Sequence, residues 1–141
     1  MTLWRQKADE MFPELVSHFE DAVTPYLLWF ELRSAFEKAY DKQPRDEPLI
    51  RRIYQYSDWC CDQPRGQTAE DDLLTCVAVC FYEHIPLHPA AREDMPRWWC
   101  ADDLREPSVF QYHLDDAQFR ELRSFLAREG HRYDSSLRSK A

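Results

Sequence analysis

The sequence predicts an all-α protein, and three features of its composition carry that prediction. Glycine occurs only twice in 141 residues, at Gly66 and Gly130, and asparagine is absent. The β-branched residues number twelve, against fourteen leucines and many Glu, Arg and Ala. This balance favours helices over strands. Two glycines cannot supply a phosphate-binding loop, a dinucleotide fingerprint or the turns of a many-stranded sheet, which argues against Rossmann domains, P-loop NTPases and β-sandwiches.

The first two helical regions are predicted from apolar periodicity and capping signals. Apolar residues recur in helical phase over 4–22, interrupted by Pro13, so either one kinked helix or two short helices satisfy the pattern. Thr24-Pro25 is typical of an N-cap followed by the first helical residue. The apolar stripe that follows reaches Tyr40, and Gln43-Pro44 ends this helix.

Two further helices follow at regular intervals. Asp46 is the expected N-cap of a helix that carries its apolar face over 49–60. Thr68, with Asp71 three residues later, predicts the start of the next helix. Because residues 73–82 have no polar face, we expect this helix to be the central and most enclosed element.

The C-terminal third contains an irregular part and a last helix. Prolines break up residues 86–99, so we expect a proline-pinned loop with a helical turn or two at 90–95. Asp115 or Asp116 is expected to open the last helix, and Gly130 stands where a C-terminal glycine cap belongs.

The chain is predicted to form a single domain of five to six helices over residues 1–130, followed by a short flexible basic tail over 131–141. Four cap candidates fall 22 residues apart, at Thr2, Thr24, Asp46 and Thr68. This spacing fits an up-and-down bundle, and it also fits a short armadillo- or HEAT-like helical stack.

The net charge and the cysteines limit the classes of partner that the protein can bind and the cellular compartment in which we expect it. Eighteen Lys and Arg against twenty-six Asp and Glu give a net charge of −8. Such a field disfavours nucleic acid and anionic lipid and favours a basic protein partner. The first residues lack a signal peptide's apolar region, and the longest nearly apolar run, 73–82, is too short to span a bilayer. Five cysteines, with Cys60 and Cys61 adjacent, predict a reduced cytoplasmic protein.

A zinc site is one alternative function. Cys76, Cys80 and His84 are spaced four residues apart, and residues at this spacing share one face of a continuous helix. However, Cys76 and Cys80 lie inside an apolar run, where free cysteine usually behaves as a small core residue. Core packing is therefore the favoured interpretation, with zinc as the alternative cofactor.

A small enzyme is the second alternative. Cys100 is the cysteine expected outside a helix, so it or a histidine could act in a cleft under the 86–99 loop. The acids that follow it, Asp102 and Asp103, disfavour a thiolate.

The favoured function is protein binding through the proline-rich region, because aromatic residues and arginines anchor many interfaces. The candidate contacts are Tyr82, His84, His88, Arg92, Trp98 and Trp99. In a competing interpretation, Trp98 and Trp99 fold back onto the core. An exposed aromatic patch could equally form a homodimer.

The stretch TAEDDLLTCVAVCFYEHIPLHPAAREDMPRWW, with LIRRIYQYSDWC before it, resembles a family of small uncharacterised bacterial all-helical proteins, a domain of unknown function. That family carries a CFYEH-type helix followed by a proline-rich loop that ends in tryptophan. The resemblance covers about residues 45–100 and implies a helical fold. In general character such acidic helical proteins are similar to bacterial immunity proteins, which neutralise a cognate toxin. We therefore expect a non-catalytic, immunity- or antitoxin-like module of the bacterial cytoplasm that occludes a more basic partner.

Overall fold

The computed structural model describes residues 1–139, and all regular elements within them are helices. Six α-helices confirm the predicted all-α class, and six short 3-10 helices raise the number of helical elements above the prediction. No helix within the described residues is both long enough and apolar enough to cross a membrane. The chain divides into two compact units, Met1–Phe81 and Tyr82 onward. The single-domain organisation over residues 1–130 stays a prediction.

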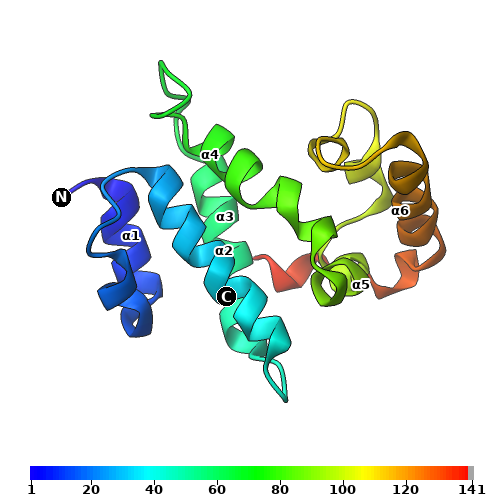
Figure 1. The fold of residues 1–141 in the computed structure, drawn as a ribbon, viewed down its shortest axis with the longest axis horizontal. Helices are drawn as coiled ribbons and strands as arrows, with labels where there is room; N and C mark the ends of the chain where they lie inside the picture. Colours follow the sequence, from blue (N-terminus) through cyan, green and yellow to red (C-terminus); the bar gives the residue numbers. More distant parts are fainter. Residues whose placement is uncertain (140–141) are drawn as a thin grey trace. The chain divides into compact units, whose positions relative to one another are not determined.

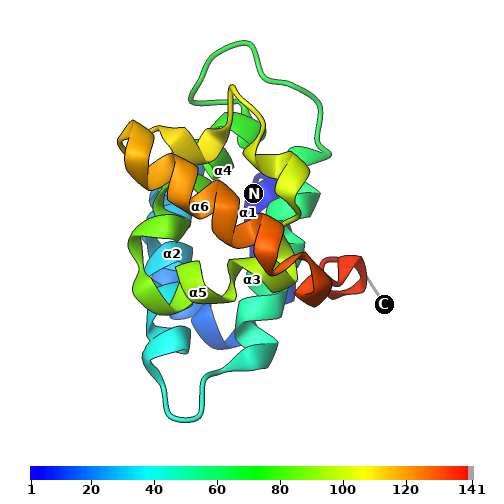
Figure 2. The same ribbon diagram turned by 90° about the vertical axis from the view of Figure 1, so that its right-hand side faces the viewer.

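The first unit is built around an antiparallel pair of helices (Figures 1 and 2). Its elements are α1 (Leu3–Met11), the 3-10 helix η1 (Pro13–Phe19), α2 (Pro25–Asp41), α3 (Glu47–Cys61) and α4 (Leu73–Cys80). A short turn joins α2 to α3, and a longer loop joins α3 to α4. Helix α4 packs on both α2 and α3, and α1 packs on α3. Helix α3 thus packs on its sequence neighbours α2 and α4, whereas the α2–α4 and α1–α3 contacts join helices two apart in the sequence.

The predicted starts of α2 and α3 are confirmed by their caps. The Thr24 side chain accepts a hydrogen bond from the Leu27 amide at 3.2 Å, and Asp46 accepts one from the Leu49 amide at 3.3 Å. Each bond satisfies an amide that has no partner within its helix. Pro13 begins η1, so the N-terminal segment forms two short helices rather than one kinked helix.

The core of the first unit is aromatic. Phe81 stacks on Trp29, with ring centroids 5.1 Å apart, and meets Phe36 edge-to-face at 4.8 Å. Trp29 also stacks on Tyr56 at 5.5 Å. All four side chains are almost completely buried. Offset stacks and edge-to-face contacts are the arrangements that aromatic pairs prefer, so these rings join α2, α3 and the end of α4.

Helix α4 corrects two expectations. It begins at Leu73, after Asp72, because Thr68 forms a turn with Asp71 instead of capping the helix. Its buried residues are Cys76, Val77 and Cys80. By contrast, 36% of Leu74 and 40% of Val79 are exposed. The helix expected over 73–82 as the central and most enclosed element therefore ends at Cys80 and leaves one face open. An entirely apolar helix carries no polar pattern that would show which face is covered.

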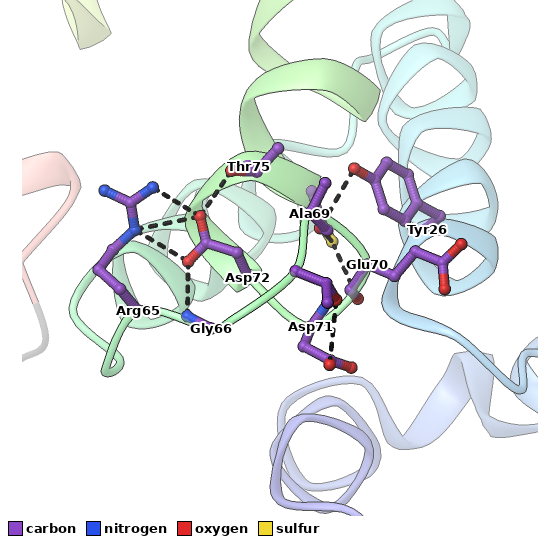
Figure 3. A network of polar contacts seen from close by, with 10 residues as sticks. Tyr26, Arg65, Gly66, Ala69, Glu70, Asp71, Asp72 and Thr75 are labelled. Carbon is purple, nitrogen blue, oxygen red and sulfur yellow. Dashed lines mark hydrogen bonds and ion pairs between the residues drawn. The ribbon is translucent and has the colours of Figure 1, made fainter.

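The loop between α3 and α4 is closed by the carboxylate of Asp72 (Figure 3). Arg65 donates to both carboxylate oxygens, at 2.9 Å from Nε and 2.7 Å from Nη2. The Gly66 amide donates at 3.0 Å and the Thr75 hydroxyl at 2.5 Å. These donors, Arg65 foremost, hold the pKa of the buried Asp72 well below its usual range. The side chain makes no hydrogen bond that caps α4 and instead ties the two ends of the loop together.

Gly66 is required where this loop closes. A Cβ atom built on Gly66 would lie 2.5 Å from the carbonyl carbon of Asp71 and 2.7 Å from the amide nitrogen of Asp72. Both are backbone atoms, so a side chain could not be accommodated without moving the chain.

The substitution Gly66→Ala should therefore destabilise the protein by about 1–3 kcal/mol, the usual effect of forcing atoms into a packed site. Gly130→Ala is the matched control, because a Cβ there meets nothing within 4 Å. Equilibrium urea unfolding of both variants measures the difference. Equal stabilities for the two variants would contradict the proposed role of Gly66.

The second unit is helical where a loop was predicted. Its elements are η2 (Tyr82–Leu87), α5 (Pro89–Trp98), η3 (Ala101–Leu104), η4 (Val109–Gln111), α6 (Asp116–Arg128), η5 (Gly130–Arg132) and η6 (Ser135–Leu137). The helical turn or two predicted at 90–95 is confirmed, with Pro89 in the first turn of α5, where proline is tolerated. The prediction of a loop for the rest of 86–99 was wrong, because η2 reaches Leu87 and α5 continues to Trp98.

The end of the second unit confirms one predicted signal and corrects another. Asp115 caps α6 by accepting from the Gln118 amide at 2.7 Å, while the Gln118 side chain accepts from the Asp115 amide at 2.9 Å. Gly130 is not a left-handed cap; no glycine in residues 1–139 has a positive φ, and Gly130 begins η5. The predicted flexible tail over 131–141 contains most of η5 and all of η6, which ends at Leu137, and residues 140 and 141 lie outside the described part.

Candidate functional site

The three large rings among the predicted contact residues are buried. The exposed fractions are 8% for Tyr82, 1% for Trp98 and 7% for Trp99. The structure thus corrects the expectation of an exposed aromatic patch at these positions and agrees with the alternative in which both tryptophans fold inward. Their buried rings leave little surface for contact with a partner or a second copy of the chain.

These rings form the core of the second unit. Trp99 meets both Tyr82 and Phe110 edge-to-face, each at 4.8 Å. The guanidinium of Arg138 lies over the Trp99 ring at 4.2 Å and donates to the Tyr82 hydroxyl at 2.9 Å. This cation–π contact explains why the segment predicted to be a free tail packs on the unit.

Trp98 is held through its indole N–H. It donates to Asp94 at 3.0 Å, and the same carboxylate accepts from Arg97 at 2.6 and 2.7 Å. The buried carboxylate therefore has strong donors, which a buried charge requires.

The other predicted contacts have local structural roles. His88 caps α5, since its Nδ1 accepts from the Ala91 amide at 3.2 Å. Arg92 lies over the Phe125 ring at 5.6 Å and 3.8 Å from a Glu121 oxygen, so it joins α5 to α6. Both are half-buried. Their existing contacts would have to be broken or shared if a partner bound them.

His84 belongs to a cluster that sequence reasoning missed. Glu83 is buried, and its Oε1 lies 3.3 Å from Nε2 of His113. The rings of His84 and His113 are 4.8 Å apart. Burial raises the pKa of the Glu83 carboxyl, and His113 partly offsets this. A carboxylate beside an imidazole can exchange protons, but no sequence spacing links residue 113 to residues 83 and 84.

The pH dependence of the stability of the variant Glu83→Gln tests whether burial raises the pKa of the Glu83 carboxyl. A carboxyl whose pKa is raised on folding contributes most to stability below its unfolded pKa and loses that contribution as pH rises through the folded value. We therefore compare the free energy of unfolding of Glu83→Gln with that of the unsubstituted protein between about pH 4 and pH 7. The difference between the two should change progressively in favour of the variant as pH rises. Glu93→Gln, at an exposed position, is the control. A difference that stays constant with pH would contradict the assignment.

The residues of the predicted zinc site do not share one helix. Helix α4 ends at Cys80, and Phe81 departs from helical geometry with φ −122° and ψ −67°. His84 therefore follows in a separate 3-10 helix. Burial raises the pKa of the Cys76 thiol to about 12, which opposes the thiolate that zinc and nucleophilic chemistry need. Within residues 1–139 no three His, Cys, Asp or Glu side chains are placed to hold one metal ion.

The cysteines behave as core residues or as local caps. Cys60, Cys76 and Cys80 are at most 1% exposed, in agreement with the core interpretation. Cys100 begins η3, where its amide donates to Asp103 at 2.9 Å. It is half-buried, and its contact with Asp103 is typical of a helix start.

The first unit contains a groove of about 470 Å³, which we call the tryptophan groove. It is lined by Thr2, Leu3, Trp4, Val23, Thr24, Pro25, Trp59, Gln63, Pro64, Glu70, Asp71 and Leu73. Its aromatic and proline side chains are large and rigid, which suits them to contact a partner at low cost in conformational entropy. Its two charged lining residues are both acidic.

Tyr56 positions both tryptophans of this groove. Its ring stacks on Trp59, with centroids 5.8 Å apart and planes 11° apart. Its hydroxyl donates to the carbonyl oxygen of Trp4 at 2.8 Å. Arg52, also on α3, donates to the Met11 carbonyl at 3.0 Å and pairs with Glu14. Helix α3 therefore holds the segment that carries Trp4.

The acidic edge of the groove comes from the loop that Asp72 closes (Figure 3). The Tyr26 hydroxyl donates to the Ala69 carbonyl at 3.4 Å, and the Thr68 hydroxyl donates to Asp71 at 3.1 Å. These bonds and the Asp72 network hold Glu70 and Asp71 at the groove while both stay exposed.

Sequence reasoning did not identify Trp4 or Trp59 as binding residues. Both occur in helical segments, where an aromatic residue predicts core packing, and only the fold brings the two segments together.

Comparison with protein-family profiles, curated proteins and solved structures gives no match for this chain.

Proposed function

We propose that this protein is a non-catalytic protein-binding module whose tryptophan groove takes an apolar segment of a basic partner. The observation that carries the proposal is an aromatic and proline-lined groove in which, among residues 1–139, Glu70 and Asp71 are the charged lining residues. Apolar side chains supply affinity, and the acidic pair favours lysine or arginine beside the bound segment.

The exposure of the apolar lining supports this proposal. Val23 is 79% exposed and Leu3 is 61% exposed, and both line the groove. Covering them would remove apolar surface from water, which is the main favourable term in association. Because Tyr56 holds Trp4 and Trp59 in place, two walls of the groove are formed before binding. Binding therefore costs little conformational entropy for these walls.

The mechanism would be occlusion. The net charge of −8 speeds encounter with a basic partner, and the groove then covers the segment that it holds. An immunity- or antitoxin-like protein of the bacterial cytoplasm would act in this way. The five cysteines form no disulfide within residues 1–139, which fits a reducing compartment.

Calorimetric titration with two short peptides tests the proposal. One has two leucines flanked by lysine and arginine, and the other has the same leucines flanked by glutamate. We expect the basic peptide to bind more tightly. Glu70→Gln combined with Asp71→Asn should weaken binding of the basic peptide about fivefold, the scale of two exposed charge interactions. Val23→Ser should weaken binding of both peptides, because it removes apolar contact.

The matched control removes two exposed acids elsewhere, through Glu93→Gln and Glu106→Gln. This variant has the same net charge as the groove variant, so a general electrostatic effect would weaken both equally. Equal affinities for the two peptides, or equal losses in the two double variants, would contradict the tryptophan groove as the binding site.

A further inference from the structure

A second groove in the first unit has a different chemistry. It measures about 220 Å³ and lies between η1, α2 and the start of α3. Its apolar walls come from Leu15, Phe19, Ala35, Ala39 and Leu49. The alanines of α2 leave space there that larger side chains would fill. We call it the lysine groove, after the two cations that line it.

Lys38 and Lys42 are these cations, one helical turn apart at the C-terminal end of α2. Both are exposed, and neither has an ion-pair partner among the described residues. Of the acids in the lining, Asp46 is engaged in capping α3. Glu31 lies about two turns before Lys38 along α2, roughly 10 Å away along the helix axis. Asp46 lies at the lysine end, where its amide donates to the Ala39 carbonyl, and His18 also lines the groove. The lysine end therefore carries two cations against one carboxylate, and Glu31 is the acid at the other end.

We propose that the lysine groove binds a medium-chain fatty acid, with the carboxylate at Lys38 and Lys42 and the alkyl chain against Ala35 and Phe19. An apolar groove with a pair of cations at one end matches an amphiphilic anion better than a neutral or cationic ligand. The acid at the other end, Glu31, disfavours a second anionic group there. This site is separate from the tryptophan groove and does not depend on the proposed function.

Three ligands with the same alkyl chain separate charge from hydrophobic contact. Decanoate, decanol and decyltrimethylammonium are titrated into the full-length protein below their micelle concentrations, with calorimetry as the readout. We expect decanoate to bind about tenfold more tightly than decanol, in line with charge-assisted hydrogen bonds to two ammonium groups, and decyltrimethylammonium to bind most weakly.

Lys38→Gln combined with Lys42→Gln should abolish the preference for decanoate over decanol and leave decanol binding unchanged. Arg120→Gln combined with Arg128→Gln, at exposed positions on α6, removes the same charge and should preserve the preference. Ala35→Phe should prevent binding of all three ligands, with circular dichroism confirming that the variant is folded.

Three outcomes would overturn the proposal. These are equal affinities for decanoate and decanol in the unsubstituted protein, a preference for decanoate that survives both lysine substitutions, and absence of binding by all three ligands.

Discussion

Tyr56 is the residue on which the first unit and its candidate site both depend. Its ring belongs to the aromatic core through Trp29, and the same ring supports Trp59. Its hydroxyl reaches across to the Trp4 carbonyl and so attaches α1 to α3. A fully buried phenol usually needs a hydrogen-bond partner, and here the partner is a backbone atom of the groove wall. Core packing and groove geometry are therefore set by one side chain.

The parts of the fold that could be predicted from the sequence are those determined locally. Thr24, Asp46 and Asp115 cap helices because a side-chain oxygen needs only an amide two or three residues away. The start of α4 could not be predicted in this way, because Asp72 is engaged by Arg65 from seven residues earlier. The conformation of Gly130 could not be predicted either. A glycine near a helix end is compatible both with a left-handed cap and with the start of a 3-10 helix, which is found here.

The candidate sites depend on distant contacts, and little of them could be predicted. The composition of the 82–99 region correctly indicated a concentration of aromatic residues, but whether they face solvent is decided by Arg138 and Phe110, which lie far away in the sequence. The tryptophan groove likewise combines residues from four separate segments. The net charge of −8, by contrast, is a property of the whole chain and can be counted from the sequence. A basic partner is expected from that charge, and the acidic residues that line the groove are in keeping with it.

Hydrogen exchange of the variant Tyr56→Phe tests most directly whether Tyr56 holds the groove wall. Phenylalanine keeps the ring in the core and removes the hydroxyl with its bond to the Trp4 carbonyl, worth about 1 kcal/mol. We expect amides of α1 to exchange roughly fivefold faster than in the unsubstituted protein, while amides of α2 keep their protection. Unchanged protection of α1, or an equal loss in both helices, would contradict the account.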